Sequence, residues 1–300
     1  MGSRALVLGG GGPVGIAWES GLLAGLARAG VDLGKADFIM GTSADSFVGA
    51  RLALGAEAAG LADPILADAA KAAAATPSTG RGAGTRGGPP ADLSKLMTLM
   101  GEAQSGARDP QAVRAEIGAF ALAAQTLDEA AFIATFGRSF AALPDDAWPE
   151  RGYACTAVDA ETGAFQMWTR DSGVGVTRAV ASSCSVPGIY PPVTLDGRRY
   201  IDGGMRSSTN ADMATGHDTV VVIAVRLGGG DERSARLSAT LDAEVKVLTD
   251  AGAKVTLIAP DAASQAAMGV NLMDFRRRGD AAKAGLAQGA ALAAELAKAW

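Results

Sequence analysis

Short apolar runs alternate with helix-like segments near the start of the chain. Residues 5–8 form an apolar run that leads into glycines, which is typical of a buried strand. Apolar residues then recur at near-helical spacing up to Gly30, a residue type that commonly ends a helix. An apolar run at residues 37–40 and a helix-like pattern over residues 47–54 repeat this order. The pattern predicts two strand–helix units in succession.

The same alternation returns in the second half of the chain. β-rich runs at residues 153–158 and 165–169, joined by a short polar segment, predict a hairpin. Further strands are predicted at residues 198–201, 219–225 and 254–259, and further helices at residues 176–185, between the last two strands, and at residues 279–299. Strands that alternate with helices predict an α/β fold, a three-layer sandwich in which helices cover both faces of a mainly parallel central sheet.

Between these two halves, residues 60–146 are alanine-rich and mostly helix-like. Within them, residues 76–90 are so rich in glycine, proline, serine and threonine that a flexible loop is expected. Such a helical insertion either covers a functional site or is a surface segment without a role at that site, and the sequence favours neither. We expect the 300 residues to form one α/β domain that carries this insertion.

Composition narrows the range of partners and cofactors. The formal net charge is −5, so the chain lacks the basic footprint of a nucleic-acid-binding protein. Two cysteines and one histidine are too few ligands for a zinc or iron–sulfur site, and no metal or cofactor is expected. No stretch approaches the roughly 20 apolar residues that a membrane span needs. We therefore expect a cytoplasmic protein without stable membrane insertion.

The first candidate for chemistry is the segment Gly41-Thr42-Ser43-Ala44-Asp45, which joins the second predicted strand to the second helix. A serine on such a turn is the nucleophile elbow of acyl hydrolases, because the turn lifts the hydroxyl out of the sheet. The N-terminus of the following helix favours the negative charge that develops during acyl transfer. A serine that only caps an ordinary helix produces the same pattern.

A glycine loop, Gly9-Gly10-Gly11-Gly12, follows the first predicted strand and opens the first helix. Backbone N–H groups in such a loop bind a phosphate or an oxyanion. With Gly15, the loop also matches the dinucleotide-binding pattern Gly-x-Gly-x-x-Gly. That kind of site needs an acidic residue at the end of the second strand, where this chain has Gly-Thr-Ser instead. We therefore expect two backbone turns at one sheet edge that serve one reaction.

A serine nucleophile needs a base, and histidine is the usual one. His217 is the only histidine, and because it stands just before the strand at residues 219–225, we expect it at the opposite edge of the sheet. Asp202 ends a predicted strand and precedes two glycines, which let its carboxylate approach other backbone. The residues available as a base therefore permit a dyad of a serine and an aspartate. A plain turn also explains an Asp-Gly-Gly sequence.

Jointly, the glycine loop after Leu8, the elbow Gly41-Thr42-Ser43-Ala44 and the segment Asp202-Gly203-Gly204 resemble the three signature blocks of patatin-like phospholipases, in the order of that family. The segment Ala181-Ser182-Ser183-Cys184-Ser185-Val186-Pro187-Gly188 also resembles the stretch before the family's aspartate. The resemblance covers roughly residues 4–274. It implies an α/β sandwich, a dyad of Ser43 and Asp202, and metal-free hydrolysis of acyl esters, often lipid esters. It also implies an oxyanion hole around Gly10, Gly11 and Gly12.

Two positions depart from the family's pattern. Val14 stands where many members carry a basic residue, so any help from that charge is missing. Asp45 replaces the last glycine of the elbow motif, and its carboxylate either opposes the developing oxyanion, points away from it or binds a cationic part of the substrate. A weakly catalytic or non-catalytic acyl-ligand binder of the same fold, an acyltransferase and a nucleotide-binding module stay open as alternatives.

Overall fold

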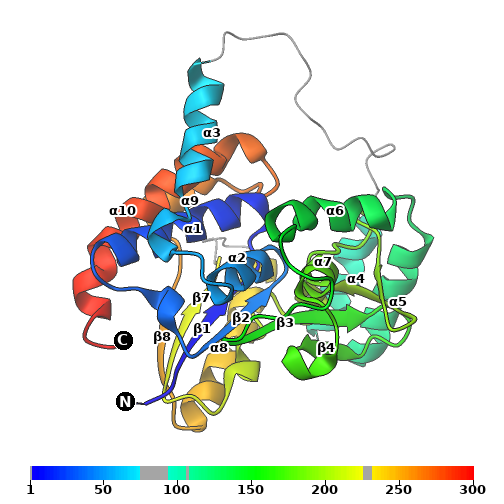
Figure 1. The fold of residues 1–300 in the computed structure, drawn as a ribbon. Coiled ribbons are helices and arrows are strands. Elements are labelled where there is room, and N and C mark those ends of the chain that lie inside the picture. Colours follow the sequence, from blue (N-terminus) through cyan, green and yellow to red (C-terminus); the bar gives the residue numbers. More distant parts are fainter. Residues whose placement is uncertain (1, 75–93, 106–107, 226–231) are drawn as a thin grey trace.

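The computed structural model of the protein describes residues 2–74, 94–105, 108–225 and 232–300. Figure 1 shows a central sheet with helices on both sides, which confirms the predicted three-layer α/β fold. The flexible loop predicted at residues 76–90 lies outside the described residues.

The described strands form one sheet in the order β5-β6-β3-β2-β1-β7-β8, with β4 paired to β3. Neighbouring strands among β1, β2, β3, β7 and β8 run parallel, as predicted, whereas β4 and β6 run antiparallel to β3, and β5 runs antiparallel to β6. The strands are β1 (Arg4–Leu8), β2 (Phe38–Thr42), β3 (Gly152–Asp159), β4 (Phe165–Trp168), β5 (Val193–Leu195), β6 (Arg198–Asp202), β7 (Thr219–Ile223) and β8 (Lys254–Ile258).

The described helices are α1 (Gly12–Arg28), α2 (Ala44–Ala53), α3 (Asp63–Ala74), α4 (Ser94–Ser105), α5 (Pro110–Ala123), α6 (Glu129–Phe140), α7 (Val176–Ser183), α8 (Glu232–Asp250), α9 (Ala262–Met268) and α10 (Arg278–Leu296). None of these helices is both long and apolar enough to cross a membrane.

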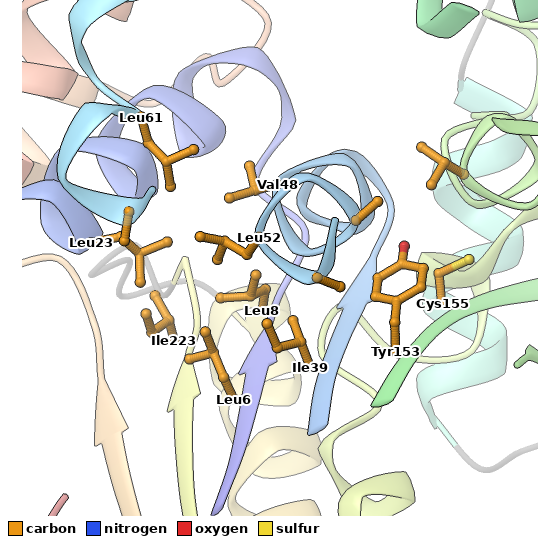
Figure 2. Packing of buried hydrophobic residues seen from close by; sticks show 14 of the residues in the cluster. Leu6, Leu8, Leu23, Ile39, Val48, Leu52, Leu61, Tyr153, Cys155 and Ile223 are labelled. Atoms are coloured by element: carbon orange, nitrogen blue, oxygen red, sulfur yellow. The ribbon is translucent and has the colours of Figure 1, made fainter. Parts of the chain in front are cut away.

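Side chains of the sheet alternate between two apolar layers, because successive residues of a strand point to opposite faces. On one face, Leu6 and Leu8 of β1 belong to the cluster that includes Leu52 of α2, and Figure 2 shows Leu8 close to Leu52. On the other face, Ala5 and Val7 belong to a separate cluster that α8 covers. The inner parallel strands β1, β2, β3 and β7 are therefore buried on both sides, which explains their largely apolar sequences.

The helical insertion contains α3 to α6 and is divided between the two faces of the sheet. α3 packs against α10. α4 and α5 contribute Leu96 and Val113 to a cluster with Val158 of β3, on the face that α8 covers. α6 lies over the other face, where Phe132 stacks on Tyr190. The described helices of the insertion therefore pack on both faces of the sheet.

Most predicted elements are present with slightly shifted ends, and two short elements were not predicted. β2 continues through Thr42, so the expected turn at Gly41 begins only at Ser43. β5 has three residues and α9 has seven, so neither is long enough to show a period in the sequence.

α1 and α10 approach each other closely through glycines. A Cβ at Gly285 would lie 2.1 Å from the Trp18 carbonyl oxygen, and a Cβ at Gly21 would lie 2.1 Å from the Ala282 carbonyl oxygen. Because α1 begins directly at the glycine loop, this helix pair also anchors that loop on the sheet.

We predict that Gly285→Ala lowers the free energy of unfolding by about 1–3 kcal/mol, because the added methyl group overlaps the Trp18 carbonyl and the two helices must separate. Urea unfolding measures the loss. Gly101→Ala in α4 is the matched control, since nothing lies within 4 Å of its added Cβ and alanine favours a helix by up to about 1 kcal/mol. Equal losses in both variants would contradict the packing argument.

Candidate active site

The elbow between β2 and α2 holds Ser43 in a strained conformation. Its φ of 57° and ψ of −136° lie in a region that residues with a side chain rarely occupy. Gly41 makes the turn possible, because a Cβ there would lie 2.4 Å from the Ser46 Cα. The Ser43 N–H donates to Ser183 Oγ (3.0 Å), and the Ser43 carbonyl oxygen accepts from Ser46 Oγ (2.6 Å). These bonds hold the strained residue in place.

The hydroxyl of Ser43 points at the carboxyl group of Asp202. Ser43 Oγ donates to Asp202 Oδ2 at 2.6 Å, and the Gly204 N–H donates to Asp202 Oδ1 at 2.7 Å. Burial raises the pKa of Asp202 to about 7, although both hydrogen bonds act in the opposite direction. A carboxyl group with a pKa near neutrality is well suited to exchange protons with a neighbouring hydroxyl.

Antiparallel pairing brings Asp202 to the level of Ser43. β6 runs antiparallel to β3, where Asp202 is the partner of Ala157. On the other side of β3, Thr156 is the partner of Thr42 in β2. Asp202 therefore ends its strand as predicted, but the strand that carries it runs against the parallel part of the sheet.

The glycine loop lies against the elbow. A Cβ at Gly10 would lie 2.8 Å from the Ser43 Cβ. The single N–H of Gly10 donates to the Ser208 carbonyl oxygen at 2.8 Å. Among the described residues, the Gly12 N–H has no hydrogen-bond partner, and the Gly11 N–H faces a carboxyl group outside ordinary hydrogen-bond geometry. The three expected glycines thus differ: Gly10 provides space beside Ser43, while Gly11 and Gly12 keep amides without a backbone acceptor.

Asp45 points into the protein, where its carboxyl group lies near the Gly11 N–H and near Glu19 of α1. Both acidic side chains are fully buried, and no described residue donates a hydrogen bond to their carboxyl oxygens. Burial raises the pKa of each carboxyl well above its usual range, and the Asp45 carboxyl raises that of Glu19 further. The pair therefore favours protonated, neutral forms. Its burial argues against a contact between Asp45 and a cationic part of a substrate.

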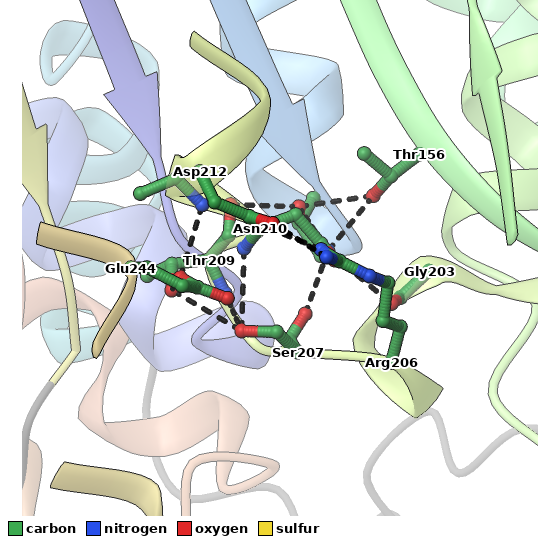
Figure 3. Close-up of polar contacts among 10 residues, drawn as sticks. Thr156, Gly203, Arg206, Ser207, Thr209, Asn210, Asp212 and Glu244 are labelled. Carbon is green, nitrogen blue, oxygen red and sulfur yellow. Dashed lines mark hydrogen bonds and ion pairs between the residues drawn. The ribbon is translucent and has the colours of Figure 1, made fainter. Parts of the chain in front are cut away.

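A buried polar network fixes the chain that follows Asp202 (Figure 3). At its centre, Asn210 adopts a left-handed conformation with φ 49°. Its Nδ2 donates to the Ser207 carbonyl oxygen at 2.7 Å and lies 3.1 Å from Thr42 Oγ1. Because Thr42 directly precedes Ser43, the network joins the segment after Asp202 to the elbow.

His217 lies away from Ser43 and Asp202, as predicted. Its ring stacks on Phe38, the first residue of β2, with centroids 5.2 Å apart, whereas Ser43 follows the last residue of that strand. Cys155 and Cys184 are both buried, and burial raises the pKa of Cys155 to about 12. Within the described residues, no group of three histidine, cysteine or acidic side chains is placed to hold a metal ion.

Four residues that support the site were missed by sequence reasoning: Glu19, Ser183, Asn210 and Glu244. Ser183 lies in the segment that resembles the stretch before the family's aspartate, but its contact with the Ser43 amide was not foreseen. Glu19 carries a readable signal, a carboxylate inside an otherwise apolar helical stretch. Asn210 and Glu244 carry none, because their partners become neighbours only through the fold; Glu244, for example, accepts from the Ala211 N–H at 3.0 Å.

Comparison with known proteins identifies the class. A family model described as patatin-like phospholipase matches residues 6–215, and the chain belongs to this family. A comparison with curated proteins gives no match.

Two solved structures resemble the whole chain at low sequence identity. VipD from Legionella pneumophila has a TM-score of 0.46 and 14% identity, covering 98% of this chain and 67% of its own. The type III effector protein ExoU has a TM-score of 0.36 and 15% identity, covering 96% of this chain and 53% of its own. The chain thus spans about half the length of ExoU.

We predict that Glu19→Gln flattens the pH dependence of stability between about pH 5 and 8. The folded protein keeps protons on Glu19 and Asp45 that the unfolded chain releases near its usual carboxyl pKa, so stability is full at low pH and falls as pH rises. For each proton that the folded protein retains, the free energy of unfolding falls by about 1.4 kcal/mol per pH unit. Urea unfolding at several pH values measures the difference.

The control for this prediction is Glu57→Gln, because Glu57 is exposed. In Glu57→Gln, the free energy of unfolding should change with pH as steeply as in the native chain. Asp202 titrates in all three proteins, so its contribution cancels in the comparison. Identical slopes for Glu19→Gln and the native chain would contradict protonation of the buried pair.

Proposed function

We propose that the protein is a lipid acyl-ester hydrolase in which Ser43 is the nucleophile and Asp202 is its base. The observation that carries this proposal is the 2.6 Å hydrogen bond from Ser43 Oγ to Asp202 Oδ2 at a strained strand-to-helix elbow. Membership of the patatin-like phospholipase family supports the same reaction class.

The proposed reaction has two halves. First, Ser43 Oγ attacks the ester carbonyl carbon while its proton passes to Asp202 Oδ2; the tetrahedral intermediate then collapses, and the leaving alkoxide takes that proton. Next, water attacks the acyl-enzyme and gives its proton to Asp202. Collapse of the second intermediate releases the carboxylic acid, and Ser43 regains its proton from Asp202. The Gly204 N–H, bonded to the other carboxyl oxygen, keeps Asp202 oriented throughout.

The Gly12 amide is the proposed donor to the tetrahedral oxyanion, because the Gly11 N–H faces the buried Asp45 carboxyl group. The Gly10 amide is bonded to Ser208, so Gly10 contributes by leaving room for the substrate beside Ser43. Donors of this kind typically lower the barrier by about 3–4 kcal/mol each. A protonated Asp45 carboxyl beneath Gly11 does not repel the oxyanion, which supports an active site over a silenced one.

We predict that a fluorophosphonate forms one adduct on the native chain and none on Ser43→Ala, because only an activated serine attacks the phosphorus. Intact-mass analysis measures the adduct. Ser139→Ala, an exposed serine on α6, is the matched control and should label like the native chain. Wild-type-like labelling or ester turnover by Ser43→Ala would refute the nucleophile assignment.

The same experiment separates the hydrolase from the non-catalytic acyl-ligand binder. Labelling of Asp45→Gly without labelling of the native chain would mean that Asp45 has silenced the elbow, and the binder would then be the better description.

We predict that kcat/KM for a short-chain p-nitrophenyl ester rises with pH through about 7 and then levels off. The reason is that Asp202 accepts the Ser43 proton only after losing its own, and its pKa is raised to about 7. Steady-state rates, corrected with the rate of Ser43→Ala at each pH, give the profile. A rate that stays level from about pH 5 to 8 would exclude Asp202 as the titrating base.

A further inference from the structure

An apolar loop projects from the surface between α9 and α10. This loop, residues 269–277, ends in the 3₁₀ turn η6 (Phe275–Arg277). Val270 is 97% exposed, Phe275 57% and Met273 38%. These are three of the six large hydrophobic side chains that are exposed in the described part of the chain; the other three lie singly on α4, α5 and α8. Clustered exposed apolar side chains mark an interaction surface.

The loop is held in shape by its own hydrogen bonds. Asn271 Oδ1 accepts from the Met273 N–H at 3.0 Å, and the Asn271 carbonyl oxygen accepts from the Asp274 N–H at 3.1 Å. At its far end, Arg277 Nη1 donates to the Ala267 carbonyl oxygen at 3.2 Å, near the C-terminus of α9. The apolar side chains are therefore presented outward by an ordered loop.

The loop also borders the candidate active site. The Val14 N–H donates to the Leu272 carbonyl oxygen at 3.1 Å. A Cβ at Gly12 would lie 3.2 Å from that same oxygen, while a Cβ at Gly10 would meet Ser43. The glycine loop thus touches the apolar loop on one side and the nucleophile on the other.

Basic residues follow the apolar side chains directly. Arg276, Arg277 and Arg278 are consecutive, in a chain whose net charge is −5. Arg276 forms a two-bond ion pair with Asp274, and the Arg278 guanidinium lies 6.0 Å from the centre of the Phe275 ring. Within residues 269–278, three arginines thus stand against one aspartate beside exposed apolar side chains. This combination complements an anionic phospholipid surface, where acyl chains lie below phosphate groups.

We propose that the apolar loop docks the protein on an anionic phospholipid surface. Val270, Met273 and Phe275 enter the boundary between head groups and acyl chains, and the arginines pair with lipid phosphates. The inference rests on the proposed function, because a lipid hydrolase must bring its nucleophile to a lipid surface. Beyond that function, the docking proposal specifies which face of the molecule meets the lipid and which lipid charge the protein prefers.

The test measures binding of the full chain carrying Ser43→Ala to vesicles, so that no hydrolysis intervenes. The vesicles are phosphatidylcholine with phosphatidylserine, and phosphatidylcholine alone. We expect binding to the mixed vesicles, at least about tenfold weaker binding to phosphatidylcholine, and at least about tenfold weaker binding to mixed vesicles when Val270→Asp and Phe275→Asp are added. Val247→Asp on α8, which covers the opposite face of the sheet, is the matched control and should bind normally.

Equal binding by the double-aspartate variant, or no binding to either vesicle, would overturn the proposal. Self-association that the double-aspartate variant abolishes, without vesicle binding, would overturn it in favour of a second copy of the chain. Because Ser43→Ala does not hydrolyse, a negative vesicle result leaves the proposed function standing. A native chain that neither labels nor hydrolyses leaves the vesicle result standing.

A second measurement does not depend on the stability of the aspartate variants. Val270→Cys in the Ser43→Ala chain offers an exposed thiol, while Cys155 and Cys184 are buried. An environment-sensitive dye attached at position 270 should shift its emission to shorter wavelength with mixed vesicles. An unchanged spectrum in the presence of bound vesicles would show that the loop stays in water and would overturn the proposal.

Discussion

The short hydrogen bond between Ser43 and Asp202 depends on three close backbone approaches, each of which requires a residue without a side chain. A Cβ at Gly41 would collide with α2, and a Cβ at Gly10 would collide with Ser43 itself. A Cβ at Gly203 would lie 2.2 Å from Thr156 Oγ1, so Asp202 reaches its position only because glycine follows it. The glycines that looked like loop signals in the sequence are therefore the places where the strand ends meet.

Three buried acidic side chains surround this meeting point, and their hydrogen bonds distinguish them. Asp202 accepts bonds from Ser43 and Gly204, which partly stabilise its ionised form, so burial raises its pKa only to about 7. Asp45 and Glu19 accept none from the described residues, and burial drives both toward the neutral form. One region of low polarity thus holds a carboxyl group with a pKa of about 7 beside a neutral acid pair.

The sequence predicted the elements that carry the site better than the pairing that brings them together. Glycine-bounded apolar runs were enough to locate β1, β2 and the elbow, because parallel strands buried on both faces have a distinctive composition. The position of Asp202 beside Ser43 depends on the antiparallel register of β6, which no local pattern encodes. The use of the Gly10 amide by Ser208 is a contact between residues far apart in the chain, so it too became visible only in the fold.

The glycine loop links the chemistry to the proposed lipid surface. On its inner side it packs against Ser43, and on its outer side its neighbour Val14 is hydrogen-bonded to Leu272 of the apolar loop. An acidic protein is repelled as a whole by an anionic membrane, so a local run of arginines determines which face approaches. Because Leu272 of the same loop accepts a hydrogen bond from the Val14 N–H, the proposed docking would bring the glycine loop close to the lipid. The proposed docking and the proposed catalysis would thus meet at one short stretch of backbone at the N-terminus of α1.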